Sequence, residues 1–382
     1  LLVMVNSNLP RGAALSSSSA LSVAALLAYA GCNGVEPDKA LLIRAAQDVE
    51  WYAGARIGVS DQTAILLGRA GALLHLAMLP GDFDLGAARH IPFPDALDLL
   101  VVNSHTRRTL SGAQRLRYSL NRFAYSMAIT VLQRELEDAG WAPDAANRMD
   151  RLSRITPEAL GGAAQVYRIL KRIPPETSLE ALRRRYNPPD LDAEYARYFG
   201  ELAEAEQPKR IPLRGPLMFG IAESERARLF PSALESGEYE SAGKLMSIGH
   251  NGDRVRTPQG AAFAVDVGDA ELEALARRNA PVALQPGAYG ASSPALDMLV
   301  DSALEAGALG ASLTGAGIAG AVLVLCRKEN SAAISCALAQ TLQQNTYARC
   351  AALRAPLDEA TARESVVINH SVAGAEELVV DG

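Results

Sequence analysis

The sequence has no hydrophobic run long enough to cross a membrane. Its longest apolar stretch, residues 20–31, is well short of the about 20 residues that a membrane-spanning helix needs. Cysteine is also scarce, and Cys32, Cys326, Cys336 and Cys350 lack the close spacing typical of zinc sites or disulfide frameworks. Reduced thiols favour a cytoplasmic location, and we expect no membrane partner.

An excess of positive charge is missing as well. The 37 Lys and Arg residues against 43 Asp and Glu give a formal net charge of −6, which offers no long-range attraction for nucleic acids. Apolar residues make up 49% and charged residues 21%, as in ordinary folded proteins, and 382 residues allow two domains. The composition favours small-molecule chemistry.

The N-terminal part alternates predicted strands and helices. Residues 1–10 are rich in strand formers and lead into four serines and an apolar helical pattern that ends at Gly31. Asp38 can open a second helix, which runs through residues 41–54. Further strands are predicted at residues 63–71, 72–79 and 98–104.

Long amphipathic helical patterns dominate from residue 113 to about residue 244. Within them, residues 174–212 contain two Pro–Pro pairs and look like a loosely packed insertion or a solvated surface of helices and loops. The remaining pattern predicts a helix at 294–310, a strand entering a Gly-rich loop at 311–320, a strand at 321–326, a helix at 331–348 and a strand at 364–372. The fold class is therefore α+β.

Three short segments could carry chemistry. In PRGAALSSSSAL, small residues and serines stand where a helix begins, which suits a phosphate group but also an ordinary capped helix. Asp61 lies after a Gly-containing turn and before an apolar stretch. This position is typical both of a catalytic acid and of a structural turn residue. Gly315, Gly317 and Gly320 allow tight turns beside a ligand or in a simple strand connection.

The order of these segments resembles the galactokinase branch of the GHMP small-molecule kinases. The shared pattern is PxGxxLSSSSAL, then GxxxGxxDQ, then LTGAGxxG, and VVNSHTRRTL, LMSIGH and YGASSPALDMLV between them are similar to family segments. The resemblance implies a two-lobed α+β GHMP kinase fold, with a ribosomal-protein-like N-terminal lobe and a ferredoxin-like, helix-rich C-terminal lobe. We expect the lobes at residues 1–112 and 113–382, the second with the insertion around 174–212.

The same resemblance implies a sugar kinase that converts ATP and a monosaccharide to a sugar 1-phosphate and ADP. Asp61 would orient or deprotonate the attacking hydroxyl and so contact the sugar. Ser18 and Glu50 would bind Mg²⁺, since hard cations prefer oxygen ligands. The residues expected to contact ATP are Pro10, Gly12, Ala13, Ala14, Ser16, Ser17, Ser18, Gly315 and Gly317.

Some positions depart from the family pattern. Ala14 and Ala319 replace glycines, each adding a methyl group where backbone and ligand should be close. Where galactokinases have a sugar-contacting Tyr, this chain aligns Arg115, or Tyr118 with a gap, and both are candidate substrate contacts. An Arg could pair with a carboxylate, so a uronic acid or arabinose stays open as the substrate. Residues 250–254 are expected to form a polar loop facing the cleft.

The family's opening sugar-binding signature is absent, so we expect an N-terminally truncated chain with an incomplete, exposed sheet edge and little activity of its own. The expected partners are a monosaccharide and ATP, with a monomer or weak dimer as the assembly. Two alternatives stay open: a catalytically inactive sugar and ATP sensor, and a GHMP kinase for mevalonate or homoserine.

Overall fold

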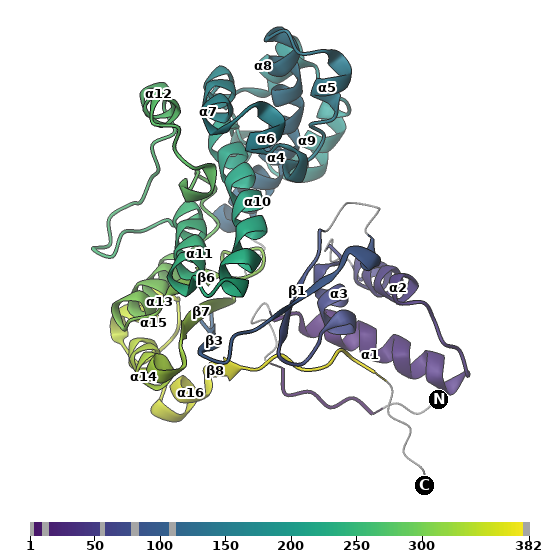
Figure 1. Ribbon diagram of the computed structural model, residues 1–382, viewed down its shortest axis with the longest axis vertical. Coiled ribbons are helices and arrows are strands. Elements are labelled where there is room, and N and C mark those ends of the chain that lie inside the picture. Colours follow the sequence, from purple (N-terminus) through teal and green to yellow (C-terminus); the bar gives the residue numbers. More distant parts are fainter. Residues whose placement is uncertain (1–3, 10–14, 54–57, 78–83, 107–111, 377–382) are drawn as a thin grey trace.

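The computed structural model describes residues 4–9, 15–53, 58–77, 84–106 and 112–376, without the side chains of residues 112–115 and 118. Helices and strands mix throughout, which confirms the predicted α+β class (Figure 1). The predicted lobe boundary at residue 112 stays a prediction. Among the described residues, no helix is both long and apolar enough to traverse a bilayer.

Three helices pack on one another at the N-terminal end: α1 (Ser17–Cys32), α2 (Lys39–Tyr52) and α3 (Ser60–Leu67). Val23, Ile43 and Leu66 meet in their shared core. Asp38 caps α2 as expected, because its carboxylate accepts hydrogen bonds from the first free backbone N–H groups of the helix, at 2.8 and 3.2 Å. The predicted second helix is thus confirmed.

Two of the strands predicted in this region are wrong. Residues 63–67 belong to α3, because Thr63 and Leu66 are buried at helical spacing and the Thr63 hydroxyl donates to the Val59 carbonyl at 2.7 Å. Residues 4–9, the described part of the predicted first strand, form no strand. Met4 and Val5 are exposed there, and an extended segment needs a neighbouring strand to become part of a sheet.

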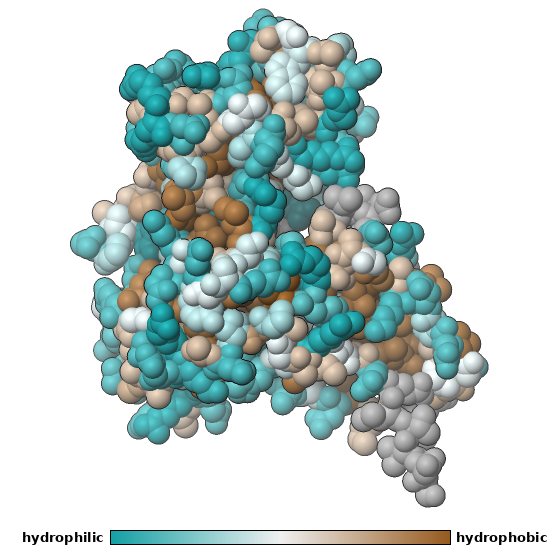
Figure 2. All heavy atoms as spheres, viewed as in Figure 1, coloured by the Kyte–Doolittle hydropathy of each residue, from teal (hydrophilic) through white to brown (hydrophobic). Residues whose placement is uncertain are grey.

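Hydrophobic side chains also remain on the outer surface of these helices. Leu21, Tyr29, Leu41 and Tyr52 are exposed, and apolar side chains gather over α1 and α2 on the face in Figure 2. The apolar residues of these two helices are therefore divided between the shared core and solvent.

Two sheets follow in the chain. A two-stranded antiparallel ribbon pairs β1 (Ala72–His75) with β2 (Arg89–Pro92). A four-stranded antiparallel sheet has the order β6 (Gly310–Leu313), β7 (Ala321–Arg327), β3 (Leu97–Asn103) and β8 (Val366–Asn369). The predicted strands around β1, β3, β6, β7 and β8 are confirmed.

The four-stranded sheet is covered on both faces. Leu100 lies opposite Val324, and both are fully buried on the face that α13 (Pro294–Glu305) and α14 (Ser331–Leu342) cover. The other face meets α10 (Arg214–Glu235) and α11 (Tyr239–Asp253) through a cluster that includes Leu97, Leu234 and Leu325. The edge strand β8 exposes Val367 and Ile368. Two short helices, α15 (Asn345–Cys350) and α16 (Glu359–Glu364), complete this part.

A separate helical region stands beyond the sheet (Figure 1). It contains α4 (Gly112–Asp138), α5 (Pro143–Asn147), α6 (Pro157–Leu160), α7 (Ala163–Arg172), α8 (Leu179–Ala181), α9 (Leu191–Phe199), α12 (Asp269–Arg277) and the short strands β4 (Glu176–Thr177) and β5 (Ile211–Pro212). The expectation that residues 174–212 pack loosely is wrong. Leu182, Phe199 and Ile211 are fully buried in the main core, and Phe199 meets the Phe123 ring edge-on at 5.6 Å.

The C-terminal segment connects the sheet to the N-terminal helices. After β8 the chain runs beside the end of α3, where the Gly374 N–H donates to the Gly68 carbonyl at 2.8 Å and the Ala375 N–H to the Ile65 carbonyl at 2.7 Å. These backbone hydrogen bonds join parts of the chain that lie far apart in sequence.

Candidate active site

The serine-rich segment forms the start of α1. Ser16 is the residue before the helix and has a left-handed backbone with a φ of 56°, and its side chain makes no capping hydrogen bond in the described chain. The first N–H groups of a helix have no partner within the helix and carry partial positive charge. This end of α1 therefore suits a negatively charged group, and the binding of phosphate there stays a prediction.

Glu50, at the end of α2, is held beside the start of α1. Ser18 Oγ donates to Glu50 Oε2 at 2.8 Å, and Ser19 Oγ donates to Glu50 Oε1 at 2.6 Å. Gln62 Nε2, from the first turn of α3, donates to the same Oε1 at 3.0 Å. Glu50 is only 4% exposed. The helices α1, α2 and α3 therefore converge on one buried carboxylate. The structure thus brings the two predicted Mg²⁺ ligands together.

These residues fit a magnesium ion shared with a nucleotide. Mg²⁺ is usually bound by one or two carboxylates, with phosphate and water oxygens completing the shell. In the described part of the chain there is no cluster of three or more His, Cys, Asp or Glu side chains that could hold a metal alone. Ser18 and Glu50 can supply a hydroxyl and a carboxylate oxygen, which leaves the other positions to phosphate and water.

Asp61 lies one residue before Gln62, in the first turn of α3. Its side chain is half-buried, with Oδ1 3.5 Å from the neighbouring Ser60 hydroxyl. The partial positive charge at the start of a helix stabilises a carboxylate at this position. Ser19 and Gln62 belong to the SSSSAL and GxxxGxxDQ motifs, but the sequence predicted no site role for either residue.

The Gly-rich loop between β6 and β7 packs against the protein's own backbone. Gly315 and Gly317 have φ values of 71° and 73°, and a Cβ atom at 317 would lie 2.3 Å from the Ala291 carbonyl oxygen. Ile318 also has a positive φ of 68°, and its N–H donates to the same oxygen at 2.5 Å. Glycine is required at 317 by this contact. Ala319 is buried within the loop.

Several predicted contacts cannot be placed in this geometry. Pro10, Gly12, Ala13 and Ala14 lie outside the described residues, and so do the side chains of Arg115 and Tyr118, whose backbone belongs to α4. Their predicted roles in binding ATP and sugar stay predictions.

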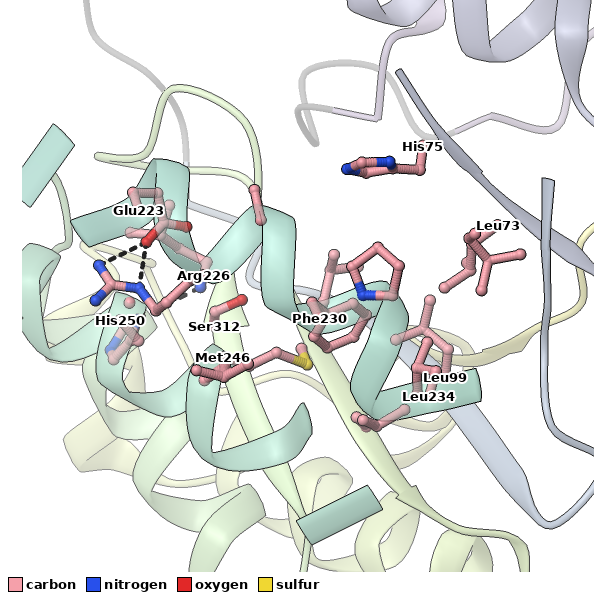
Figure 3. A pocket seen from close by; sticks show the side chains of 18 of the residues that line it. Leu73, His75, Leu99, Glu223, Arg226, Phe230, Leu234, Met246, His250 and Ser312 are labelled. Atoms are coloured by element: carbon pink, nitrogen blue, oxygen red, sulfur yellow. Dashed lines mark hydrogen bonds and ion pairs between the residues drawn. The ribbon is translucent and has the colours of Figure 1, made fainter. Parts of the chain in front are cut away.

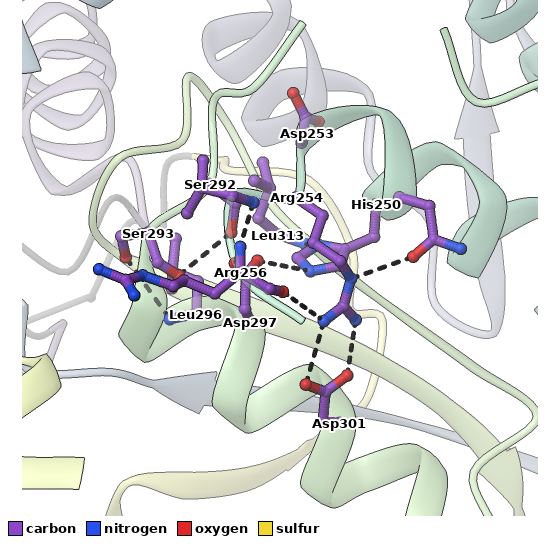
Figure 4. Close-up of polar contacts among 12 residues, drawn as sticks. His250, Asp253, Arg254, Arg256, Ser292, Ser293, Leu296, Asp297, Asp301 and Leu313 are labelled. Atoms are coloured by element: carbon purple, nitrogen blue, oxygen red, sulfur yellow. Dashed lines mark hydrogen bonds and ion pairs between the residues drawn. The ribbon is translucent and has the colours of Figure 1, made fainter. Parts of the chain in front are cut away.

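The expected polar loop at residues 250–254 is wrong. His250 and Asp253 belong to the last turn of α11 and are buried, and Arg254, also buried, follows the helix (Figure 4). Arg254 donates two hydrogen bonds to Asp301, at 2.6 and 3.0 Å. From the sequence alone the segment resembles a polar loop, because Asp301, the partner of Arg254, lies in α13 and is distant in sequence. The pairing of Arg254 with Asp301 permits the burial of this charged side chain.

Asp297, on α13, is the second acid of this network. Its Oδ2 accepts from the backbone N–H groups of Val255 and Arg256 at 3.0 and 2.8 Å, and its Oδ1 lies 3.1 Å from His250 Nε2. Desolvation raises the pKa of Asp297, but the neighbouring His250 and Ser292 side chains outweigh that effect and leave the pKa below its usual value. The network fixes the end of α11 against α13.

A cavity of about 430 Å³ lies between β1 and the helices α10 and α11 (Figure 3). Its apolar wall includes Leu73, Phe230 and Met246, and its polar end includes Arg226 and Asp253. Burial raises the pKa of the Asp253 carboxyl to about 7. This cavity was not predicted, since it forms between segments distant in sequence.

Two family models match this chain, one in each half. The family description "GHMP kinases N terminal domain" matches residues 1–69, and "GHMP kinases C terminal" matches residues 268–344. The chain is 25% identical to a galactokinase of Roseiflexus sp. over 348 residues, covering 90% of this chain and 65% of that protein. A galactokinase of Streptomyces coelicolor is 28% identical over 332 residues, covering 85% and 60%.

A solved structure shares the fold. A crystal structure of Lactococcus lactis galactokinase complexed with galactose superposes with a TM-score of 0.53 at 17% sequence identity, covering 97% of this chain and 68% of that one. The chain spans 65% and 60% of the length of the two curated galactokinases. The matches run through both halves of the chain, and together they support a galactokinase-like GHMP kinase.

Proposed function

We propose that the protein is an ATP-dependent sugar kinase that phosphorylates the anomeric hydroxyl of a monosaccharide. The observation that carries this proposal is the convergence of α1, α2 and α3, where Ser18 and Glu50 are in contact and Asp61 lies beside Gln62. Resemblance to galactokinases supports the sugar as acceptor. Phosphoryl transfer needs mainly alignment and electrostatic stabilisation, which such an arrangement supplies.

Each residue has a defined part in this proposal. The start of α1, with Ser16 and Ser17, binds the phosphates of ATP through backbone N–H groups and hydroxyls. Ser18 and Glu50 hold Mg²⁺, which when bound neutralises phosphate charge. Asp61 accepts the proton of the sugar hydroxyl as its oxygen bonds to the γ-phosphorus and the bond to ADP breaks. Gly315 and Gly317 extend this nucleotide site in the same proposal.

The experiment is Mg·ATP-dependent ADP release by the full natural protein over a panel of aldoses and uronic acids. The proposal predicts release with at least one sugar and none without sugar. Galactose, arabinose and galacturonic acid separate the neutral from the acidic substrates. Release only with mevalonate or homoserine would contradict a sugar kinase.

A sensor that binds sugar and ATP without turnover is the second candidate. The observation in its favour is the alanine at positions 14 and 319, where the family pattern has glycine. It predicts ATP binding by calorimetry together with no ADP release from any sugar of the panel. That result would replace the kinase proposal.

A further inference from the structure

The Glu50 carboxylate accepts three hydrogen bonds, and its two oxygens lie in different environments. Oε1 accepts from Ser19 Oγ and Gln62 Nε2, whereas Oε2 accepts from Ser18 Oγ. Ser19 and Gln62 are 1% and 0% exposed, while Ser18 is exposed. One oxygen is therefore engaged inside the protein, and the other lies beside the hydroxyl at the surface.

The inner contacts fix the orientation of the carboxylate. A carboxylate with one free torsion at its end can rotate and exchange its oxygens unless donors hold it. Two donors on Oε1, from α1 and from α3, prevent that rotation. Residues that hold a metal ligand in this way commonly change metal affinity 10- to 100-fold when they are replaced.

We propose that Gln62, together with Ser19, is a positioning residue that presents Glu50 Oε2 and Ser18 Oγ to the metal of the bound nucleotide. Gln62 adjoins Asp61 in the first turn of α3, so the same turn carries the proposed catalytic acid and fixes the proposed metal ligand. The inference rests on the proposed function, because it assumes that Glu50 binds the metal.

The Gln62 side chain has a second property that suits this role. Its Oε1 is buried and has no hydrogen-bond partner in the described part of the chain, whereas its Nε2 donates to Glu50 Oε1. Retaining a buried amide with an unsatisfied oxygen is unfavourable for stability alone. A leucine of similar size could not donate a hydrogen bond to the Glu50 carboxylate, as Gln62 does.

The test measures Mn²⁺ affinity in the presence of ATP, by electron paramagnetic resonance, for the wild type, Gln62→Leu, Glu50→Gln and the double variant. We expect Gln62→Leu to weaken Mn²⁺ binding about tenfold or more. In the Glu50→Gln background the same change should alter affinity less than about twofold, because Gln62 acts through Glu50. ATP affinity measured in EDTA should stay the same.

Thr63→Val is the matched control. Thr63 is buried in the same helix, and its hydroxyl donates to the Val59 carbonyl rather than to Glu50. It should leave Mn²⁺ affinity unchanged. If Gln62→Leu does not fold, Ser19→Ala removes the other inner donor, and Ser19→Thr, which keeps the hydroxyl, should restore the affinity.

The outcomes separate this inference from the proposed function. If Glu50→Gln weakens Mn²⁺ binding but neither Gln62→Leu nor Ser19→Ala does, the positioning role is wrong and the metal ligand stands. The positioning role is also wrong if Gln62→Leu weakens Mn²⁺ binding equally in the wild-type and the Glu50→Gln backgrounds. If Glu50→Gln has no effect, the metal assignment itself is wrong, and the inference with it.

Discussion

Asp253 is a carboxylic acid that the fold holds away from water, at the polar end of the cavity beside α11. Burial raises its pKa to about 7, and the nearby Glu223 carboxylate adds to the rise, while a hydrogen bond from the Ala291 N–H opposes it. The charged form of Asp253 is therefore disfavoured in the folded protein relative to the unfolded chain. Such groups occur at binding and catalytic sites as well as in structural networks.

This residue gives a prediction with a definite sign. A carboxyl whose folded pKa exceeds its unfolded pKa of 3.8 destabilises the protein increasingly as pH rises from 3.8 to about 7, and by a constant amount above that. Asp253→Asn should therefore gain stability relative to wild type between pH 5 and pH 8, by roughly 2 to 3 kcal/mol. Denaturant unfolding at both pH values measures it.

The control for this prediction is Asp95→Asn, which removes an exposed carboxylate. Its effect on unfolding free energy should be small and similar at both pH values. A gain from Asp253→Asn that does not change with pH would show that the carboxyl is not held neutral by the fold.

At the scale of elements, the Gly-rich loop offers a matched pair of glycines. Both Gly315 and Gly317 have positive φ, but an added Cβ at 315 would meet no atom of the described residues within 4 Å, whereas at 317 it would meet the Ala291 carbonyl oxygen at 2.3 Å. Gly315→Ala should therefore cost about 1–2 kcal/mol for its backbone alone. Gly317→Ala should cost about 3 kcal/mol or more, because the overlap adds to the strain.

Thermal or denaturant unfolding of the two variants checks this difference. Equal losses would mean that the contact with Ala291 does not determine the choice of glycine. Loss of ATP binding by Gly315→Ala at a temperature where the variant is still folded would support a nucleotide site at this loop.

Local sequence patterns predicted most elements of the C-terminal half, because strands such as β3 and β7 are compact apolar runs and α13 is clearly amphipathic. They did not predict α3, since its short apolar stretch suits a strand equally well until Thr63 and Leu66 are seen to share one buried face. The burial of His250 and Arg254 was also missed, because it depends on Asp297 and Asp301 of another helix.

At the scale of the whole molecule, the candidate site was predicted in part. Ser18 and Glu50 were expected as metal ligands from the resemblance to the family. They do lie in contact, because α1 and α2 follow one another in the chain and pack together. The partners that orient Glu50 were not expected. A hydrogen bond between Gln62 and Glu50 depends on how three helices pack, which residue spacing alone does not specify.

In the proposed sugar kinase, phosphoryl transfer takes place at the junction of α1, α2 and α3. The most direct test follows the sugar 1-phosphate by ³¹P nuclear magnetic resonance, for the full natural protein with Mg·ATP and its preferred sugar. Asp61→Asn is compared with Asp48→Asn, which changes an exposed carboxylate on α2. We predict that Asp61→Asn loses product formation at least about 100-fold while ATP affinity is kept, and that Asp48→Asn behaves as wild type. Undiminished product from Asp61→Asn would show that Asp61 is not the catalytic acid and that the transfer does not depend on this junction.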